Sequence, residues 1–405
     1  MAPPRHVIIA GAGIAGLSAA LALVRAGLRV SVFEQAEKLE ETGAGIQLSP
    51  NAVRILDALG LRDRLLASAF APPAIRVMAG RSAREIMRIP LGPTAERRYG
   101  APFLTIHRAD LQAALVAAAR DKRDVSLRLG VQVADYAVHE NGITVQGRRG
   151  REAVEERGVA LVGADGIWSS LRRRLRQRRP RFSRRTAWRA LIPANTLPRE
   201  YRDLVYLWLG PDSHLVHYPV KRGAFINIVA IVQENWNEQG WSAPGQREVL
   251  LRHFARWSWS DDVRDLLSVP EQWLKWALYE ASGPMHPGLG PITLVGDAAH
   301  PMLPFLAQGA GMAIEDAAIL AAMLGKYLDD PADALRGYEG ARHHRIERVR
   351  KASRRQGRIY GMTGPEALVR NLAMAALGGE KLLTRYDWLY NWSAPDIVPV
   401  QSTLS

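Results

Sequence analysis

Three glycines and one acidic residue near the start of the chain have the types and spacing that could bind a dinucleotide. Gly11, Gly13 and Gly16 form a GxGxxG motif, and Glu34 closes the next apolar run. The glycines would let a pyrophosphate approach the backbone, and the carboxylate could accept hydrogen bonds from a ribose. The motif fits NAD or FAD, whereas an acid at position 34 disfavours the 2′-phosphate of NADP.

The segments around this motif predict the strand–helix–strand unit that such a turn requires. Residues 6–10 form an apolar run typical of a buried parallel strand, residues 17–25 have a helical pattern, and residues 29–33 repeat the strand pattern. The glycines lie between the first strand and the helix, so the helix N-terminus would face the phosphates.

Two aspartates stand at the ends of two further predicted strands. Asp165 follows the apolar run 159–162, and Asp297 follows the run 292–295, after which residues 313–324 predict a helix. Ligands of open α/β sheets bind at the carboxyl ends of the strands, so both carboxylates are candidates for the same site. Asp297 also has a structural interpretation, because Asp is a favoured helix N-cap.

Taken together, these motifs resemble those of the flavin-dependent aromatic-ring monooxygenases, the class A family that includes para-hydroxybenzoate hydroxylase and salicylate hydroxylase. The match rests on the glycine motif at 11–16, a DG motif at Asp165 and a GD motif at Asp297, in the family order. Three further matching segments are 42–51, 107–111 and 386–390. The last of these resembles the branch of the salicylate hydroxylases and 3-hydroxybenzoate 6-hydroxylases.

The resemblance implies FAD as the cofactor and NAD(P)H as a transient co-substrate. In the family, the glycine motif holds the pyrophosphate, Arg108 lies along the FAD, and Asp297 binds the ribityl chain. Asp165 links the FAD site to NAD(P)H docking, and residues 308–310 offer backbone N–H groups to the reduced flavin. The cofactor-binding candidates are Gly11, Gly13, Ile14, Ala15, Gly16, Glu34, Gly45, Ile46, Gln47, Arg108, Asp165, Gly296, Asp297, Pro304, Gly309, Ala310 and Gly311.

The same resemblance implies the reaction. NAD(P)H reduces the FAD, O2 forms a flavin C4a-hydroperoxide, and this hydroxylates a phenolic ring that deprotonation has made electron-rich. The expected substrate is a small anionic aromatic of the hydroxybenzoate or salicylate type. Two alternatives stay open: hydroxylation or epoxidation of a larger polycyclic or quinone-like compound, and a non-catalytic flavin-binding sensor or interaction protein.

The region between the DG and GD motifs predicts the substrate-binding sheet. Residues 205–209, 215–220 and 225–232 have the pattern of adjacent antiparallel strands. Period-two alternation places His214 and Tyr218 on one face and His217 on the other. The resemblance makes His214 the candidate base or phenolate hydrogen-bond partner and Tyr218 the residue that positions the substrate. No arginine within 201–280 is identified as a partner for a substrate carboxylate.

The composition of the 405 residues limits the other functions. The absence of cysteine excludes thiolate chemistry and disulfides and fits a reducing, cytoplasmic location. The net charge of +14 is concentrated in nine arginines between Arg172 and Arg185, which predict a solvated surface that attracts small anions rather than a specific nucleic-acid site. No apolar run predicts a membrane span, and the pair His343 and His344 lacks a third metal ligand.

The predicted fold class is α/β. A doubly wound, Rossmann-like FAD-binding domain comprises residues 1–72, 100–185 and 281–360, and a hairpin is predicted at Asn141-Gly142. An interleaved, mainly antiparallel substrate domain comprises 73–99 and 186–280. Residues 361–405 form a C-terminal helical tail, and the protein is expected to be a monomer or a homodimer.

Overall fold

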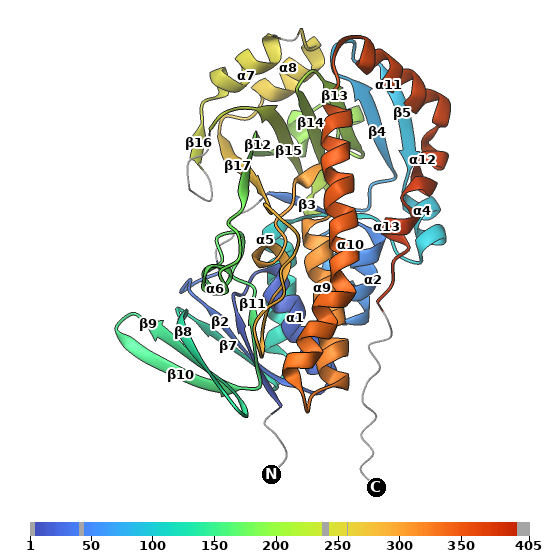
Figure 1. Cartoon of the computed structure of the whole chain (residues 1–405). Helices are drawn as coiled ribbons and strands as arrows, with labels where there is room; N and C mark the ends of the chain where they lie inside the picture. The colour runs from blue at the N-terminus through green and yellow to red at the C-terminus, as the bar shows by residue number, and fades with distance from the viewer. Residues whose placement is uncertain (1–4, 40–43, 237–242, 257, 395–405) are drawn as a thin grey trace.

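Two large sheets form the opposite halves of the molecule in this computed structural model (Figure 1). The structure describes residues 5–39, 44–236, 243–256 and 258–394. Residues 42 and 43 of the motif at 42–51, and residues 395–405 of the predicted tail, lie outside the described residues.

The first sheet is parallel and carries the glycine motif. In spatial order its strands are β18 (Ile292–Leu294), β11 (Ala160–Gly163), β1 (His6–Ala10), β2 (Arg29–Glu34) and β7 (Val125–Leu129). The carboxyl ends of β1, β11 and β18 are therefore neighbours at one edge, as the three motifs predict. The apolar runs of these strands are buried on both faces, which is why they lack polar alternation.

Helices cover one face of the parallel sheet and a small antiparallel sheet covers the other. The helices are α1 (Ile14–Arg25), α5 (Arg108–Arg120) and α9 (Gly309–Lys326), and α1 packs along α9. The small sheet consists of β8 (Gln132–His139), β9 (Gly142–Arg149) and β10 (Glu152–Gly158). The predicted hairpin at Asn141-Gly142 joins β8 to β9 and is confirmed.

The second sheet has eight strands and is mainly antiparallel. Its order is β16 (Ala243–Gly245), β17 (Trp273–Glu280), β12 (Arg181–Pro193), β15 (Phe225–Gln233), β14 (Ser213–Val220), β13 (Val205–Gly210), β4 (Ala74–Ala79) and β5 (Glu85–Pro90). The three strands predicted between 205 and 232 are β13, β14 and β15, which pair as expected. One face of the sheet packs on α7 (Arg247–Ala255) and α8 (Asp261–Ser268) through a tryptophan-rich core.

The remaining helices join the two halves. The longest is α10 (Pro331–Tyr360), which runs beside α9 and past the eight-stranded sheet (Figure 1). The others are α2 (Pro50–Ala58), α3 (Arg62–Leu66), α4 (Gly92–Tyr99), α6 (Ser170–Arg174), α11 (Gly364–Leu377), α12 (Gly379–Arg385) and α13 (Asp387–Tyr390). The short pair β3 (Gly45–Leu48) and β6 (Leu104–His107) lies between the sheets. The expected α/β fold class, with its antiparallel sheet and C-terminal helices, is confirmed.

In the described parts of the chain, no helix has both the length and the apolar character that crossing a bilayer requires.

Candidate active site

The turn between β1 and α1 presents free backbone N–H groups to open space. Gly13 is the N-cap of α1, and no side chain caps the helix. Leu17 donates the first helical hydrogen bond, to the Gly13 carbonyl, so the N–H groups of Ile14, Ala15 and Gly16 have no partner within the helix. A Cβ added at Gly13 would meet nothing within 4 Å. This geometry fits a pyrophosphate.

The other two glycines of the motif are fixed by close packing. Gly11 has φ +111°, and a Cβ there would lie 2.5 Å from the Ala164 carbonyl oxygen. A Cβ at Gly16 would lie 1.9 Å from the Gly11 carbonyl oxygen. Any side chain at either position would therefore push β1, α1 and the DG segment apart.

Glu34 lies at the end of β2, beside the same turn. Its carboxylate accepts hydrogen bonds from the backbone N–H groups of Ala12 at 2.8 Å and Ala36 at 2.9 Å. Each carboxylate oxygen has a second lone pair, so the side chain is held in place and can still accept a hydrogen bond from a ribose.

The DG and GD motifs meet through a buried arginine. Asp165 accepts hydrogen bonds from the backbone N–H groups of Ser170 at 2.7 Å and Leu171 at 3.3 Å, and therefore caps α6. Its second oxygen, Oδ1, is buried without a partner among the described residues. Arg172 donates at 3.2 Å to the carbonyl oxygens of Asp297 and Ala298, so it ties the two motifs together.

Arg172 corrects one sequence-based expectation. We interpreted the arginine run from Arg172 to Arg185 as solvated surface, which is wrong for Arg172, because this residue is only 4% exposed. Burial lowers the pKa of its guanidinium, and the nearby carboxylates of Asp165 and Asp297 oppose that shift. The composition of an arginine-rich segment does not show which of its side chains is buried.

Asp297 is exposed at the turn after β18, and its carboxylate makes no hydrogen bond to any described residue. Gly296, immediately before it, has φ +58°, and a Cβ there would lie 2.8 Å from the Ala15 side chain. This contact brings the GD turn against the glycine motif. The N-cap interpretation of Asp297 is wrong, because α9 begins at Gly309.

The N-terminus of α9 is a second uncapped helix start. The helix begins four residues before the predicted segment 313–324, so Gly309, Ala310 and Gly311 form its first turn, and no side chain caps it. A Cβ at Gly309 would meet nothing within 4 Å. These residues therefore present orphan N–H groups where the resemblance expects the flavin.

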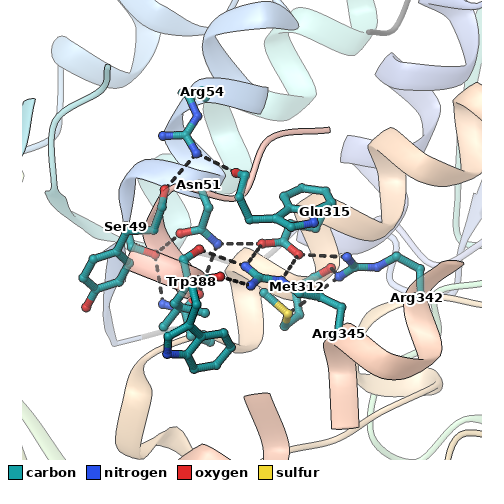
Figure 2. A network of polar contacts seen from close by, with 12 residues as sticks. Ser49, Asn51, Arg54, Met312, Glu315, Arg342, Arg345 and Trp388 are labelled. Carbon is teal, nitrogen blue, oxygen red and sulfur yellow. Dashed lines mark hydrogen bonds and ion pairs between the residues drawn. The ribbon is translucent and has the colours of Figure 1, made fainter. Parts of the chain in front are cut away.

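A buried polar network fixes this helix start (Figure 2). The Gln308 side chain donates to the Ser49 hydroxyl at 2.9 Å and accepts from the Asn51 amide at 3.2 Å. The same Asn51 amide donates to Glu315 at 2.7 Å, and Glu315 is held at 2.8 Å by both Arg342 and Arg345. Arg345 also donates to the Trp388 carbonyl at 2.7 Å, so the C-terminal segment 386–390 supports the network.

Arg108 and the strand β3 lie between the two halves of the molecule. Arg108 begins α5, and its backbone N–H donates to the Ala44 carbonyl at 3.0 Å. Burial lowers the pKa of its guanidinium, while the charge of Asp297 opposes the shift. The structure therefore brings the segments 107–111 and 296–297 near one another, as the resemblance implies.

Strand β3 touches the eight-stranded sheet directly at Tyr218. The Gly45 N–H donates to the Asn227 side chain at 2.7 Å, and a Cβ at Gly45 would lie 2.6 Å from the Tyr218 ring. The Gln47 side chain lies close enough to Tyr218 to lower the pKa of its phenol, and Ile46 lies between Gly45 and Gln47 on β3. The candidate cofactor-binding residues therefore lie next to the candidate substrate-binding residues.

His214 lies four residues from Tyr218 on the same face of β14, with Val216 between them. Its ring packs against Phe305 at 5.4 Å and Tyr360 at 5.1 Å between ring centroids. Phe305 belongs to the loop 304–306, whose first residue is the cofactor candidate Pro304. Among the described residues nothing hydrogen-bonds the His214 imidazole. The face that carries His214 and Tyr218 is therefore turned toward the cofactor candidates.

Burial keeps both predicted catalytic side chains neutral. Burial, together with the nearby charge of Arg185, lowers the pKa of His214 to about 3. Burial raises the pKa of Tyr218 above its ordinary value, against the opposing effect of Arg189. At physiological pH an imidazole and an undissociated phenol therefore face the same space.

His217 lies on the opposite face, as the alternation predicts. Its ring stacks on Tyr206 with a centroid distance of 4.7 Å and an interplanar angle of 7°. It is fully buried, and neither ring nitrogen has a partner in the described structure. His217 is a core residue beneath α7 and α8.

Sequence reasoning missed two charged residues on the His214 face, Arg185 and Arg189. Arg189 on β12 stacks on the Trp276 ring at 4.9 Å, and its Nε is buried without a hydrogen-bond partner in the described structure. Period-two alternation along 181–193 would have placed Arg189 with Arg185, but it leaves open which face is turned inward.

Fold and site together define a class of protein. Uncapped helix starts and glycine turns cluster at the ends of β1, β11 and β18, and they fit the pyrophosphate and flavin of FAD. Beside them stands a sheet face with a neutral histidine, a tyrosine and two arginines. This arrangement is that of a flavin-dependent enzyme with a separate sheet for its substrate.

Comparison with known proteins supports this class of enzyme. The model of the FAD binding domain family matches residues 5–353, so the chain belongs to this family. It is 39% identical over 402 residues to 3-amino-4-hydroxybenzoate 2-monooxygenase PtnB3 of Streptomyces platensis, covering 97% of each chain. It is 37% identical to 3-hydroxybenzoate 6-hydroxylase 1 of Aquipseudomonas alcaligenes, covering 95% of this chain and 97% of the relative.

Solved structures give the same result. A salicylate hydroxylase in complex with its substrate superposes with a TM-score of 0.81 at 27% identity, over 98% of this chain and 97% of the other. The protein is a FAD-dependent monooxygenase that uses NAD(P)H as co-substrate.

Proposed function

We propose that this enzyme hydroxylates the ring of a small phenolic acid of the hydroxybenzoate type, with NAD(P)H and O2 as co-substrates. The named relatives act on 3-amino-4-hydroxybenzoate and 3-hydroxybenzoate. When bound, FAD supplies the two-electron activation of O2. The chain must hold the ring beside the cofactor, polarise its hydroxyl group and exclude water.

One observation carries the proposal: the contact of β3 with the Tyr218 face. Gly45 and Gln47 are both cofactor candidates, and the Tyr218 ring lies 2.6 Å from the position of a Cβ at Gly45, while Gln47 is close enough to lower the pKa of the Tyr218 phenol. A ring held on this face would therefore lie against the flavin.

His214 and Tyr218 can form different hydrogen bonds with the substrate. His214 is neutral, so its imidazole can accept a hydrogen bond from the substrate phenol. A pKa of about 3 makes it a weak base, and the nearby guanidinium of Arg185 stabilises the negative charge that builds on the phenol oxygen. Tyr218, as an undissociated phenol, can donate a hydrogen bond to the substrate.

Apolar groups close this face to water. Phe305 and Tyr360 pack on His214, and Leu303 and Ile231 extend the apolar cluster beside them. Exclusion of water favours product over release of H2O2.

The proposal extends to assembly and location. We expect a monomer or a homodimer, measurable by light scattering of the FAD-loaded protein. A cytoplasmic location would supply the NAD(P)H that the reaction consumes.

The test is consumption of NAD(P)H and O2 by the FAD-loaded enzyme with a panel of phenolic acids. The panel contains 3-hydroxybenzoate, 4-hydroxybenzoate, salicylate and 3-amino-4-hydroxybenzoate, and hydroxylated product and H2O2 are measured together. At least one acid should accelerate consumption and appear as hydroxylated product. If only a larger ring system is hydroxylated, or if every compound yields peroxide alone, the proposal is wrong.

A further inference from the structure

Arg189 has a charge that no group in the described structure balances. Its Nε is buried without a hydrogen-bond partner, and among the described residues its terminal amino groups form no hydrogen bond or ion pair. Burial lowers the pKa of the guanidinium, the neighbouring Tyr218 side chain opposes this shift, and the positive charge of Arg108 adds to it. Buried charges are normally paired, since removal from water costs several kcal/mol per ion. A guanidinium in this position is suited to bind an anion.

The neighbouring arginine on the same strand provides an internal comparison. Arg185 lies four residues away on the same face of β12, over the Phe305 ring at 5.1 Å. The carboxylates of Asp212 and Glu280 act on its pKa, whereas no carboxylate acts on that of Arg189. Of the two arginines on the face, Arg189 is therefore the one whose partner has to come from outside the chain.

The register of the sheet places Arg189 at a useful distance from His214. Arg189 on β12 pairs with Val229 of β15, which pairs with Val216 of β14, and His214 is two residues from Val216 on the same face. Two interstrand spacings and an offset of two residues along the strand place the two Cα positions about 12 Å apart. Both side chains project from the same face, so a single substituted benzene ring can span the gap between them.

The Trp276 ring fixes the direction of the guanidinium. It stacks on Arg189 at 4.9 Å from guanidinium carbon to ring centroid, which holds the planar fork against an apolar wall. A guanidinium fork held in one plane recognises a carboxylate through two parallel hydrogen bonds.

We propose that Arg189 binds the carboxylate of the substrate and so sets which end of the ring lies at His214. The inference rests on the proposed function and deepens it, because it makes the acid group a requirement for recognition. The carboxylate binds at Arg189, and the phenolic hydroxyl lies toward His214 and Tyr218.

The test compares an acid with its uncharged isostere. Calorimetry measures binding of 3-hydroxybenzoate and of 3-hydroxybenzamide to the FAD-loaded wild type, Arg189→Met and Arg189→Lys, and steady-state assays give KM and kcat for each. Arg184→Met, at an exposed position on the same strand, is the control. Arg189→Met should weaken binding of the acid on the order of 100-fold and that of the amide less than about 3-fold. Arg189→Lys should restore part of the loss.

The outcomes separate the two proposals. If the wild type hydroxylates the acid and Arg189→Met binds it equally well, the assignment of Arg189 is wrong and the proposed function stands. If no phenol is hydroxylated but acids bind in an Arg189-dependent manner, the function fails and the assignment stands. Loss of FAD from Arg189→Met, with unchanged acid binding after reconstitution, would assign Arg189 to the cofactor and overturn the inference. If no acid binds to the wild type, both fail.

Discussion

The cofactor side of this protein is built from backbone, whereas the substrate side is built from side chains. At the ends of β1, β11 and β18, the groups that face the proposed FAD site are mainly N–H groups of uncapped helix starts, at Gly13 and Gly309. On the eight-stranded sheet, the facing groups are the side chains of His214, Tyr218 and Arg189.

This difference explains how tightly the amino-acid sequence of each region is constrained. A backbone site demands glycine where a Cβ would collide, as at Gly11 and Gly16, so its sequence is tightly constrained. A sheet face holds any side chain that fits, and exchange of one residue changes the ligand while the fold persists. The cofactor half therefore defines the class of enzyme, and the substrate half defines the compound.

The largest effect is expected from Gly16→Ala. Its new methyl group would lie 1.9 Å from the Gly11 carbonyl, so the turn must open, with loss of FAD from the purified protein and destabilisation by about 3 kcal/mol. Flavin absorbance and urea unfolding measure the two effects. Gly340→Ala in α10 is the control, because a Cβ there meets nothing within 4 Å. Full flavin content in Gly16→Ala would contradict the packing argument.

The second largest effect is expected from a substitution on the eight-stranded sheet, at His214. His214→Ala should slow hydroxylation by about 100-fold, the usual contribution of a positioned proton-transfer or hydrogen-bonding group, and flavin reduction by less than about 3-fold. Stopped-flow absorbance separates the two half-reactions. An equal fall in both rates would show that His214 is structural and that the sheet face does not govern the oxygen chemistry.

A smaller effect is expected from a substitution in the glycine motif that leaves the fold intact. Gly13→Ala adds a methyl group where the protein leaves space, at a residue with φ −75° that alanine adopts readily. We expect the Kd for FAD to rise about 10-fold, while the apo protein unfolds at an unchanged or slightly higher urea concentration. An unchanged Kd would show that the pyrophosphate lies elsewhere.

The smallest effect distinguishes the two histidines of β14. Burial lowers the pKa of His217 to about 3, from an ordinary value of 6.5. Between about pH 6.5 and pH 3, the imidazole is therefore protonated in the unfolded chain and neutral in the folded chain. The free energy of unfolding accordingly decreases as the pH falls through this window. Each such histidine contributes about 1.4 kcal/mol per pH unit.

His217→Phe should remove one proton from this dependence. The phenylalanine keeps the stack on Tyr206 and removes two buried, unpartnered nitrogens. Urea unfolding at pH 7, 6 and 5 should give a shallower slope than the wild type, with hydroxylation of the bound substrate retained. An identical slope would show that His217 is already protonated or exposed in the folded state.

The amino-acid sequence predicted the regular parts of the structure well. The strand–helix–strand unit at 6–34, the hairpin at Asn141-Gly142 and the pairing of the strands between 205 and 232 were all predicted from local patterns. The start of α9 at Gly309 was missed, because glycines disfavour helix and the turn is stabilised by a distant network through Glu315 and Arg345.

Charged residues were harder to place than apolar ones. Arg172 belongs to an arginine-rich run whose composition favours the surface, yet it is buried and joins the DG and GD turns. Arg189 is a single charge in an apolar stretch of β12, and its Nε is buried on the sheet face that carries His214. Long side chains take their environment from neighbours that are remote in sequence, so local patterns do not specify it.

By itself, the sequence determined the class of enzyme, because the three motifs that mark the cofactor site are short and local, and the contact that requires Gly16 lies within its own turn, against the Gly11 carbonyl. The tertiary structure decided which polar groups meet on the substrate side. Strands β17, β12, β15 and β14 are brought into this order only by long-range pairing, which sets Arg189 beside Trp276 and on the same face as His214.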